Sequence, residues 1–165
     1  MRFGRLLKHL MLPAWHVRRV FSRADLAAIG RSIAASETAH RGELRFVVEG
    51  PLPISALWRG VSARSRAAAL FARLRIWDTE ENSGILIYVQ LVDRRVEILA
   101  DRGIARRVPQ AEWDAICRGM ERSFRAREWR NGALEAVERV GAVLARHFPA
   151  AAANPDELPD TPLVL

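Results

Sequence analysis

The sequence predicts an α/β sandwich built on a small mixed sheet. Its elements follow the order helix, strand, helix, strand, strand, helix, helix. The first two strands are joined through a helix, and such a crossover is right-handed and makes the strands parallel. The second and third strands are joined by a short polar turn at 92–94, so the third strand runs antiparallel to the second. These features together predict a three-stranded mixed sheet with helices packed on it.

Residues 1–21 predict a basic amphipathic arm. Apolar residues recur there at helical spacing, and Pro13 ends the helix: Phe3, Leu6, Leu7, Leu10 and Met11. Six of the seven net positive charges lie in residues 1–23, which contain no acid. One interpretation is a surface helix that lies on anionic lipid or on a protein partner. The other, which we favour, is a helix packed on its own domain with its arginines facing water, because amphipathic helices mostly serve a core.

Residues 22–149 predict the folded domain. Ser22 and Asp25 have the spacing of a capping box at the start of the first long helix, and Gly42 follows its end. The predicted helices span about 22–40, 62–76, 110–127 and 131–147, and the predicted strands span 43–50, 84–91 and 95–100. The tail at 150–165 is small, acidic and proline-rich, so we expect it to be extended or disordered.

Composition excludes several classes of protein. Half of the residues are apolar, which excludes a wholly disordered chain. No apolar run reaches the roughly 18 residues of a membrane span, and no secretory signal is apparent, so we expect a cytoplasmic protein, peripheral at the inner membrane if the arm binds lipid. Cys117 is the single cysteine, which fits a reducing compartment. No P-loop or dinucleotide fingerprint is present, so we expect no nucleotide cofactor.

The hairpin carries a family resemblance. The stretch "NSGILIYVQLVDRRVEILADRGI" resembles the signature of the TPM domain, and Trp77 before it and "REWRNGALEAVERVGAVL" after it extend the likeness over about residues 22–149. The resemblance implies a three-layer α/β/α sandwich. Relatives include a photosystem II repair protein of the thylakoid lumen and bacterial envelope proteins, and acid phosphatase activity and divalent-metal binding are attributed to some members. This sequence departs from the pattern in its "NSG" step, which is one residue longer than the usual Asn-Gly step. Many relatives carry a signal peptide and a downstream membrane helix, and we expect neither here.

A candidate site lies where the first long helix meets the sheet. Glu37 and His40 are three residues apart and are expected to share a helical face, and Glu43 begins the first strand. The topology brings Asp101, at the end of the third strand, to the same edge. The predicted metal ligands are Glu37, His40, Glu43 and Asp101, with Asp78, Glu81 and Asn82 as weaker candidates. The alternative is that Glu37 and His40 hydrogen-bond each other, or pair with Arg102 or Arg41, at a polar rim of the sheet.

The ligand types indicate a divalent cation. Carboxylates suit Ca²⁺, Mg²⁺ or Mn²⁺, whereas an imidazole shifts the preference towards Mn²⁺, Fe²⁺ or Zn²⁺. The leading prediction is a TPM-like binding or accessory module that takes such a cation and docks on a membrane surface or a protein partner through residues 1–21. The alternative is a metal-dependent acid phosphatase, with Asp101 or Glu43 holding the ion and Arg102 orienting the phosphate. Nucleic-acid binding is not expected, because the basicity is confined to the arm.

The tryptophans divide into two groups. Trp15 and Trp58 lie in or beside less regular segments and are candidates for exposed anchors. Trp77, Trp113 and Trp129 lie next to apolar stripes and are expected in the core. Cys117 lies inside a helix and is interpreted as a small core residue rather than a nucleophile.

Overall fold

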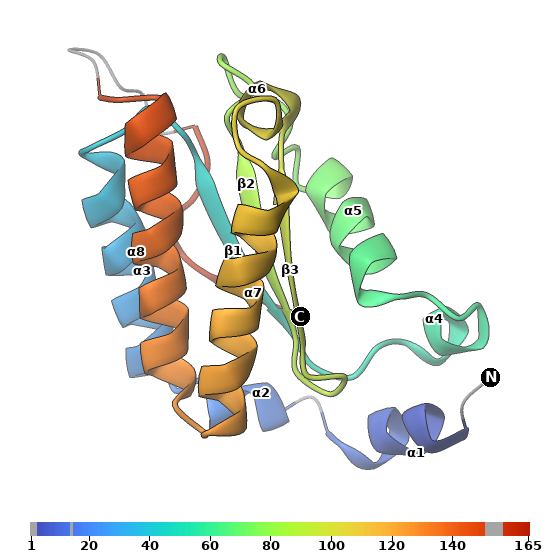
Figure 1. Ribbon diagram of the computed structural model, residues 1–165. Helices are drawn as coiled ribbons and strands as arrows, with labels where there is room; N and C mark the ends of the chain where they lie inside the picture. The colour runs from blue at the N-terminus through green and yellow to red at the C-terminus, as the bar shows by residue number, and fades with distance from the viewer. Residues whose placement is uncertain (1–2, 14, 151–156) are drawn as a thin grey trace.

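The computed structural model describes residues 3–13, 15–150 and 157–165, which form eight helices and a mixed four-stranded sheet (Figure 1). The strands are β1 (Leu44–Glu49), β2 (Ile85–Gln90), β3 (Arg95–Ala100) and β4 (Leu163–Val164), in the spatial order β3-β2-β1-β4. β1 and β2 are parallel and β3 is antiparallel to β2, as predicted. β4 was not predicted, and it pairs parallel to β1 on the side away from β2.

Helices cover both faces of the sheet. One face carries α3 (Arg23–Glu37), α7 (Gln110–Arg125) and α8 (Trp129–His147), and the other carries α5 (Ala63–Arg73), as Figure 1 shows. Four shorter helices lie at the ends of the sheet: α1 (Phe3–Met11), α2 (His16–Val20), α4 (Ile54–Trp58) and α6 (Arg102–Ala105). The predicted three-layer α/β/α sandwich is confirmed.

The alternation of side chains in the strands produces two cores. Leu44, Phe46 and Val48 of β1 face the larger core under α3, α7 and α8, whereas Val47 faces the smaller core under α5. Every residue of β2 is buried, because this strand has a neighbour on each side and a helical layer on each face. β1 and β2 are therefore the rigid platform from which the site residues project.

The first long helix begins as predicted but ends early. The Ser22 hydroxyl accepts from the Asp25 amide, and the Asp25 carboxylate accepts from the Ser22 amide, which completes a capping box. α3 ends at Glu37, and His40 lies beyond it in an isolated bridge with Pro149. Glu37 and His40 therefore do not share a helical face, and that interpretation was wrong.

Part of the N-terminal arm belongs to the larger core. Val17 and Phe21 have no exposed surface. The ring of Phe21 lies 6.0 to 6.4 Å from the rings of Phe46, Phe124 and Trp129 in edge-on contacts. Aromatic pairs of this geometry add to the stability gained by burial alone.

The predictions for the five tryptophans can be compared with the structure. Trp129 is half-buried and packs against the larger core. Trp15 and Trp58 are exposed, as predicted, and Trp113 is buried, as predicted. Trp77 is 47% exposed, so its assignment to the core was wrong. The reason is local: the chain turns after α5 through Arg75, which has a positive φ of 55°, and Ile76 takes the buried place instead.

Two glycines allow the hairpin to pack tightly on the loop before it. A Cβ at Gly84 would lie 2.0 Å from the carbonyl oxygen of Ile76, and one at Gly103 would lie 2.4 Å from the carbonyl oxygen of Glu81. Both distances are too short for any side chain. Glycine is therefore required at both ends of the hairpin, because another segment of backbone lies against each position.

Candidate functional site

Glu43 and Asp101 lie at the same edge of the sheet, as the topology predicts. The Ile85 amide donates to the Glu43 carbonyl at 2.8 Å, and the Asp101 amide donates to the Gly84 carbonyl at 2.9 Å. Glu43, Gly84 and Asp101 therefore form one row across three neighbouring strands. Two strand spacings, roughly 10 Å, separate the backbones of Glu43 and Asp101.

Three acidic side chains gather at the start of β1, and we call them the carboxylate cluster: Glu37, Glu43 and Asp160. Glu37 is the last residue of α3, and its Oε1 accepts from the Leu44 amide at 3.4 Å. Glu43 Oε2 accepts from the Leu158 amide at 3.0 Å. Asp160 precedes β4 and hydrogen-bonds Glu37. Glu37 and Glu43 are buried, and Asp160 is half-buried.

Asp160 is the residue that sequence reasoning missed. It lies in the tail, which was expected to be extended or disordered, yet β4 brings this segment alongside β1. The Arg45 guanidinium fixes it further by donating to the carbonyl of Thr161 at 2.7 Å and to the carbonyl of Pro159. The signal that would have found it is the apolar "PLVL" at the end of the tail, which suits a short strand.

The electrostatics of the cluster favour a bound proton. Burial raises the pKa of Glu37 to about 9, with further contributions from the Glu43 carboxylate and from Asp160. The Leu44 amide acts in the opposite direction. Glu37 is therefore protonated at neutral pH, because carboxylates placed close together in a buried site do not all ionise.

We predict that Glu37→Gln removes a pH dependence of stability. The folded pKa of Glu37 is about 9 and its ordinary value is 4.5, so between these values the folded state holds the proton more tightly than the unfolded state does. Stability is therefore greatest below the ordinary pKa and falls as pH rises through this window. As pH rises through this window, the free energy of unfolding should fall by on the order of 2 kcal/mol more in the native protein than in Glu37→Gln.

Urea denaturation at a series of pH values measures this difference. Glu138→Gln, which removes an exposed carboxyl on α8, serves as the matched control and should leave the pH profile unchanged. Parallel profiles for the native protein and Glu37→Gln would contradict the raised pKa.

His40 lies in surroundings separate from those of the carboxylate cluster. The side chain is fully buried, and its Nε2 lies 3.3 Å from the Ser36 hydroxyl. A Cβ at Gly141 of α8 would lie 3.6 Å from the same nitrogen. Burial lowers the pKa of His40, so the imidazole is neutral. These contacts place His40 against α3 and α8.

Asp101 and Arg102 form the start of α6. Asp101 Oδ1 accepts from the Arg102 amide at 2.7 Å and so caps this helix. Asp101 Oδ2 is buried and has no hydrogen-bond partner among the described residues. The Arg102 guanidinium donates to Asn82 Oδ1 at 2.8 Å, so Arg102 is tied to the loop before the hairpin.

The remaining weaker candidates form ion pairs at the rim. Glu81 pairs with Arg41, and Asp78 pairs with Arg75. Both pairs are partly exposed. Over residues 3–13, 15–150 and 157–165, no three His, Cys, Asp or Glu side chains form a group arranged to hold a metal ion. Of the four main predicted ligands, the structure brings Glu37 and Glu43 together, and it adds Asp160.

Comparisons with known proteins agree with this fold. A sequence model of the TPM domain matches residues 17–143. The chain belongs to the TPM domain family. This TPM domain is similar to the NMR structure of the BA42 protein from the psychrophilic bacterium Bizionia argentinensis, with 27% sequence identity and a TM-score of 0.77 over 88% of this chain and 95% of that one. No curated protein matches it.

The match to the TPM domain begins at residue 17, within α2. Val17, at that position, is also the first residue of the larger core. In the part of this TPM domain that the structure describes, no helix is long and apolar enough to cross a bilayer.

Proposed function

We propose that this TPM domain is a binding module that takes a divalent cation at the carboxylate cluster. The supporting observation is the convergence of Glu37 and Glu43, from either side of one turn, with Asp160 of the distant tail in a largely buried place. Like charges brought together in this way are unfavourable unless a proton or a cation neutralises them. In the protein alone, the proton on Glu37 reduces the negative charge of the cluster. A bound cation would neutralise the cluster in place of that proton.

The chemistry of the donors fits a hard cation. All three side chains offer carboxylate oxygens, which suit Ca²⁺, Mg²⁺ or Mn²⁺ better than Zn²⁺. Glu37 and Glu43 would supply two of the ligands after their side chains move, because the described side chains do not already form a group arranged around an ion. Asp160 would supply Oδ1, which is buried and has no hydrogen-bond partner among the described residues. Because the ion must displace the proton of Glu37, its affinity should rise with pH.

The alternative, a metal-dependent phosphatase at the same place, receives less support. Arg102, the predicted phosphate-orienting group, is bound to Asn82, and Asp101 caps α6. Burial raises the pKa of the Cys117 thiol to about 12, so the thiol is protonated and offers no nucleophile. These contacts favour binding of a cation over turnover of a phosphate ester.

A thermal shift on chelator-stripped protein tests the proposal. Each of Ca²⁺, Mg²⁺, Mn²⁺ and Zn²⁺ is added at about pH 6 and about pH 8.5. A cation at a hundred times its Kd adds roughly 2.7 kcal/mol, which raises Tm by several degrees in a domain of this size. We expect one of Ca²⁺, Mg²⁺ or Mn²⁺ to stabilise the protein, more strongly at the higher pH.

Two double variants distinguish binding of the cation at the carboxylate cluster from binding at the rim. Glu43→Gln/Asp160→Asn should abolish the shift, whereas Glu81→Gln/Asp78→Asn, a matched pair at the rim, should keep it. A shift that survives in the first pair, or no shift with any cation, would overturn the proposal. Hydrolysis of a phosphate monoester that needs the same cation and the same acids would favour the enzyme alternative.

A further inference from the structure

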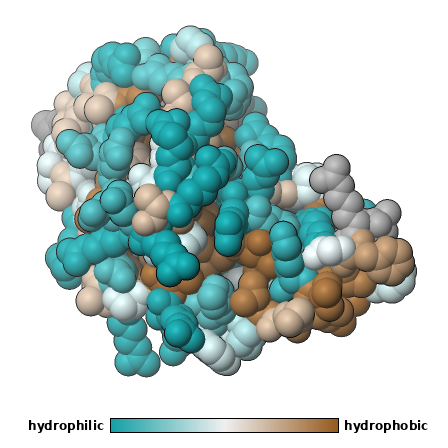
Figure 2. Space-filling model, turned by 60° about the horizontal axis from the view of Figure 1, so that its bottom comes forward, coloured by the Kyte–Doolittle hydropathy of each residue, from teal (hydrophilic) through white to brown (hydrophobic). Residues whose placement is uncertain are grey.

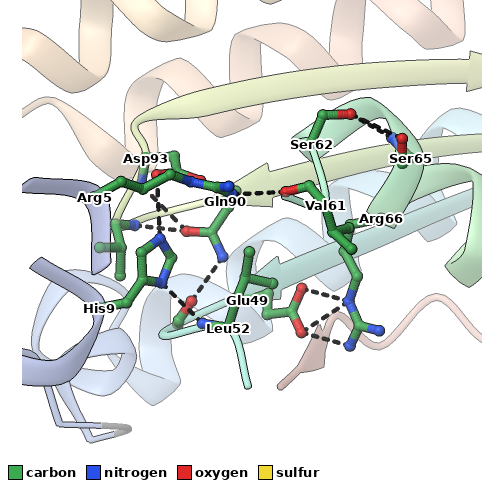
Figure 3. Close-up of polar contacts among 12 residues, drawn as sticks. Arg5, His9, Glu49, Leu52, Val61, Ser62, Ser65, Arg66, Gln90 and Asp93 are labelled. Carbon is green, nitrogen blue, oxygen red and sulfur yellow. Dashed lines mark hydrogen bonds and ion pairs between the residues drawn. The ribbon is translucent and has the colours of Figure 1, made fainter. Parts of the chain in front are cut away.

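The helix α1 lies on the domain with its polar side inward. Arg5 donates to Asp93 through Nε at 3.0 Å and through Nη2 at 2.8 Å, and Nη2 also donates to the Val61 carbonyl. His9 is buried, and Figure 3 shows its ring between Asp93 and Leu52. The Leu52 amide donates to His9 Nδ1 at 2.9 Å, so Nε2 carries the proton and donates to Asp93 at 3.1 Å.

Asp93 is the anchor for this orientation. It lies in the turn between β2 and β3, and two side chains one helical turn apart on α1 reach it. Burial alone would raise the pKa of Asp93, but its bonds to Arg5 and His9 lower it below its ordinary value. The carboxylate is therefore ionised, and it holds the polar side of α1 against the domain. The expectation that the arginines of this helix face water was wrong for Arg5.

The consequence is that the apolar side of α1 faces outward. Phe3, Leu7, Leu10 and Met11 share one side of the helix and are between 56 and 79% exposed. Trp15, just beyond Pro13, is exposed as well. Figure 2 shows hydrophobic residues gathered at one corner of this face of the molecule, where α1 lies.

The short helix α4 enlarges the same apolar region. Leu6 of α1 packs on a small cluster formed by Leu52, Ala56 and Leu57, so the two helices are joined. Ile54 and Trp58, one turn apart on α4, point away from that cluster and are exposed. We call the seven exposed side chains the apolar face: Phe3, Leu7, Leu10, Met11, Trp15, Ile54 and Trp58. Large exposed apolar patches with polar rims mark interaction sites.

Basic residues border the apolar face. A groove of about 1330 Å³ lies between α1, the start of α5 and the hairpin turn, and five of its side chains are Arg or Lys: Arg5, Lys8, Arg64, Arg94 and Arg95. Its two acids are already paired, Asp93 with Arg5 and Glu97 with Arg64. Lys8 and Arg94 are exposed at its margin, and α1 and α2 contain no acid. The surroundings of the apolar face are therefore positive.

We propose that the apolar face docks on an anionic membrane surface. The exposed side chains of α1 and α4 enter the boundary between headgroups and acyl chains, and Lys8 and Arg94 contact lipid phosphates. A group of exposed apolar side chains flanked by basic residues is typical of a helix that lies in a membrane interface. Here the Asp93 anchor presents that helix already folded and with its apolar side outward. The docking does not depend on the proposed cation.

Flotation of the full chain with lipid vesicles tests this inference, with a chelator present so that no cation takes part. The vesicles are phosphatidylcholine alone, or phosphatidylcholine with about one-third phosphatidylglycerol. We expect binding to the anionic vesicles that weakens at high salt and is much poorer with the neutral ones. Leu7→Ser/Trp58→Ser should lower the binding at least about tenfold, because two apolar anchors are lost.

Matched variants keep the test specific. Trp77→Ser/Ala34→Ser changes two exposed apolar residues elsewhere and should bind like the native protein. Lys8→Ser/Arg94→Asn should weaken binding to anionic vesicles only, whereas Arg31→Ser/Arg73→Asn, an exposed pair on α3 and α5, should not. Asparagine suits the positive φ of 52° at Arg94. Thermal unfolding of every variant confirms that it is folded.

Two results of the flotation experiment would overturn the proposal. One is native protein that does not float with anionic vesicles. The other is equal binding by the native protein and Leu7→Ser/Trp58→Ser. If gel filtration instead shows a dimer that Leu7→Ser/Trp58→Ser disperses, a second copy of the chain covers the apolar face and the membrane proposal fails.

Discussion

Replacing Arg66 with alanine is expected to lower the free energy of unfolding by about 3–5 kcal/mol, because it leaves a buried charge without its partner. Glu49, at the end of β1, is 3% exposed. Arg66 of α5 donates to this carboxylate through Nε at 2.9 Å and Nη2 at 2.6 Å, and Figure 3 shows this two-pronged contact. The Tyr88 hydroxyl donates to Glu49 at 2.6 Å.

The three residues tie α5 to the two central strands. Burial and the bond to Glu49 raise the pKa of Tyr88 well above its ordinary value, so the hydroxyl remains a donor. In Arg66→Ala this hydroxyl would be the only side chain still bonded to Glu49 among those described here. The carboxylate would then be stabilised poorly, because one neutral hydrogen bond does not replace a buried ion pair.

Chemical denaturation of three variants measures the effect. Arg73→Ala removes an exposed arginine from the same helix and should change the free energy of unfolding by less than about 0.5 kcal/mol. Arg66→Met/Glu49→Leu removes both charges and should recover much of the loss, because replacing a whole buried pair with apolar residues is often neutral. A loss in Arg66→Ala no larger than that in Arg73→Ala would show that the pair contributes little.

Replacing Gly84 with alanine is expected to cost about 3 kcal/mol or more. The new Cβ would lie 2.0 Å from the carbonyl oxygen of Ile76 and 3.0 Å from Ile76 Cγ2. Because the nearest obstacle is backbone, the chain at Ile76 or the start of β2 must move. The start of β2 is tied to its neighbour, since the Gly84 carbonyl accepts from the Asp101 amide. Relief of the contact would therefore disturb the edge of the sheet.

Gly60→Ala is the matched control for Gly84→Ala. Gly60 has a positive φ of 66° and nothing within 4 Å of an added Cβ, so this change introduces backbone strain without a collision. It should cost only about 1–2 kcal/mol. Denaturation midpoints compare the two variants. If Gly84→Ala is no less stable than Gly60→Ala, the close approach to Ile76 does not constrain this position.

The main elements of the fold could be predicted because their signals are local. Ser22 and Asp25 are three residues apart, and their capping box forms within one turn of helix. The hairpin is encoded by two apolar runs around a short turn, although the turn has four residues, 91–94, one more than predicted. The parallel pairing of β1 and β2 follows from the handedness of the crossover.

The candidate site was predicted in part for the same reason. Glu37 and Glu43 lie close to each other in sequence, on either side of one turn, and the structure brings both into the carboxylate cluster. His40 was placed by continuing the helical period beyond the residue where α3 ends. Asp160 is more than a hundred residues from Glu43 in sequence, and no local pattern connects them.

The sequence by itself determined the four long helices, the hairpin, the parallel crossover and the amphipathic character of α1, but it did not indicate the short helices α2, α4 and α6. Tertiary structure decided the position of the tail and the orientation of α1. β4 has two residues, too few to show a period, and its order comes from pairing with β1. The apolar stripe of α1 is visible in the sequence, but the side that faces the domain depends on Asp93, some 84 residues away from His9. Periodicity defines the faces of a helix, and only the partner in space determines which face is buried.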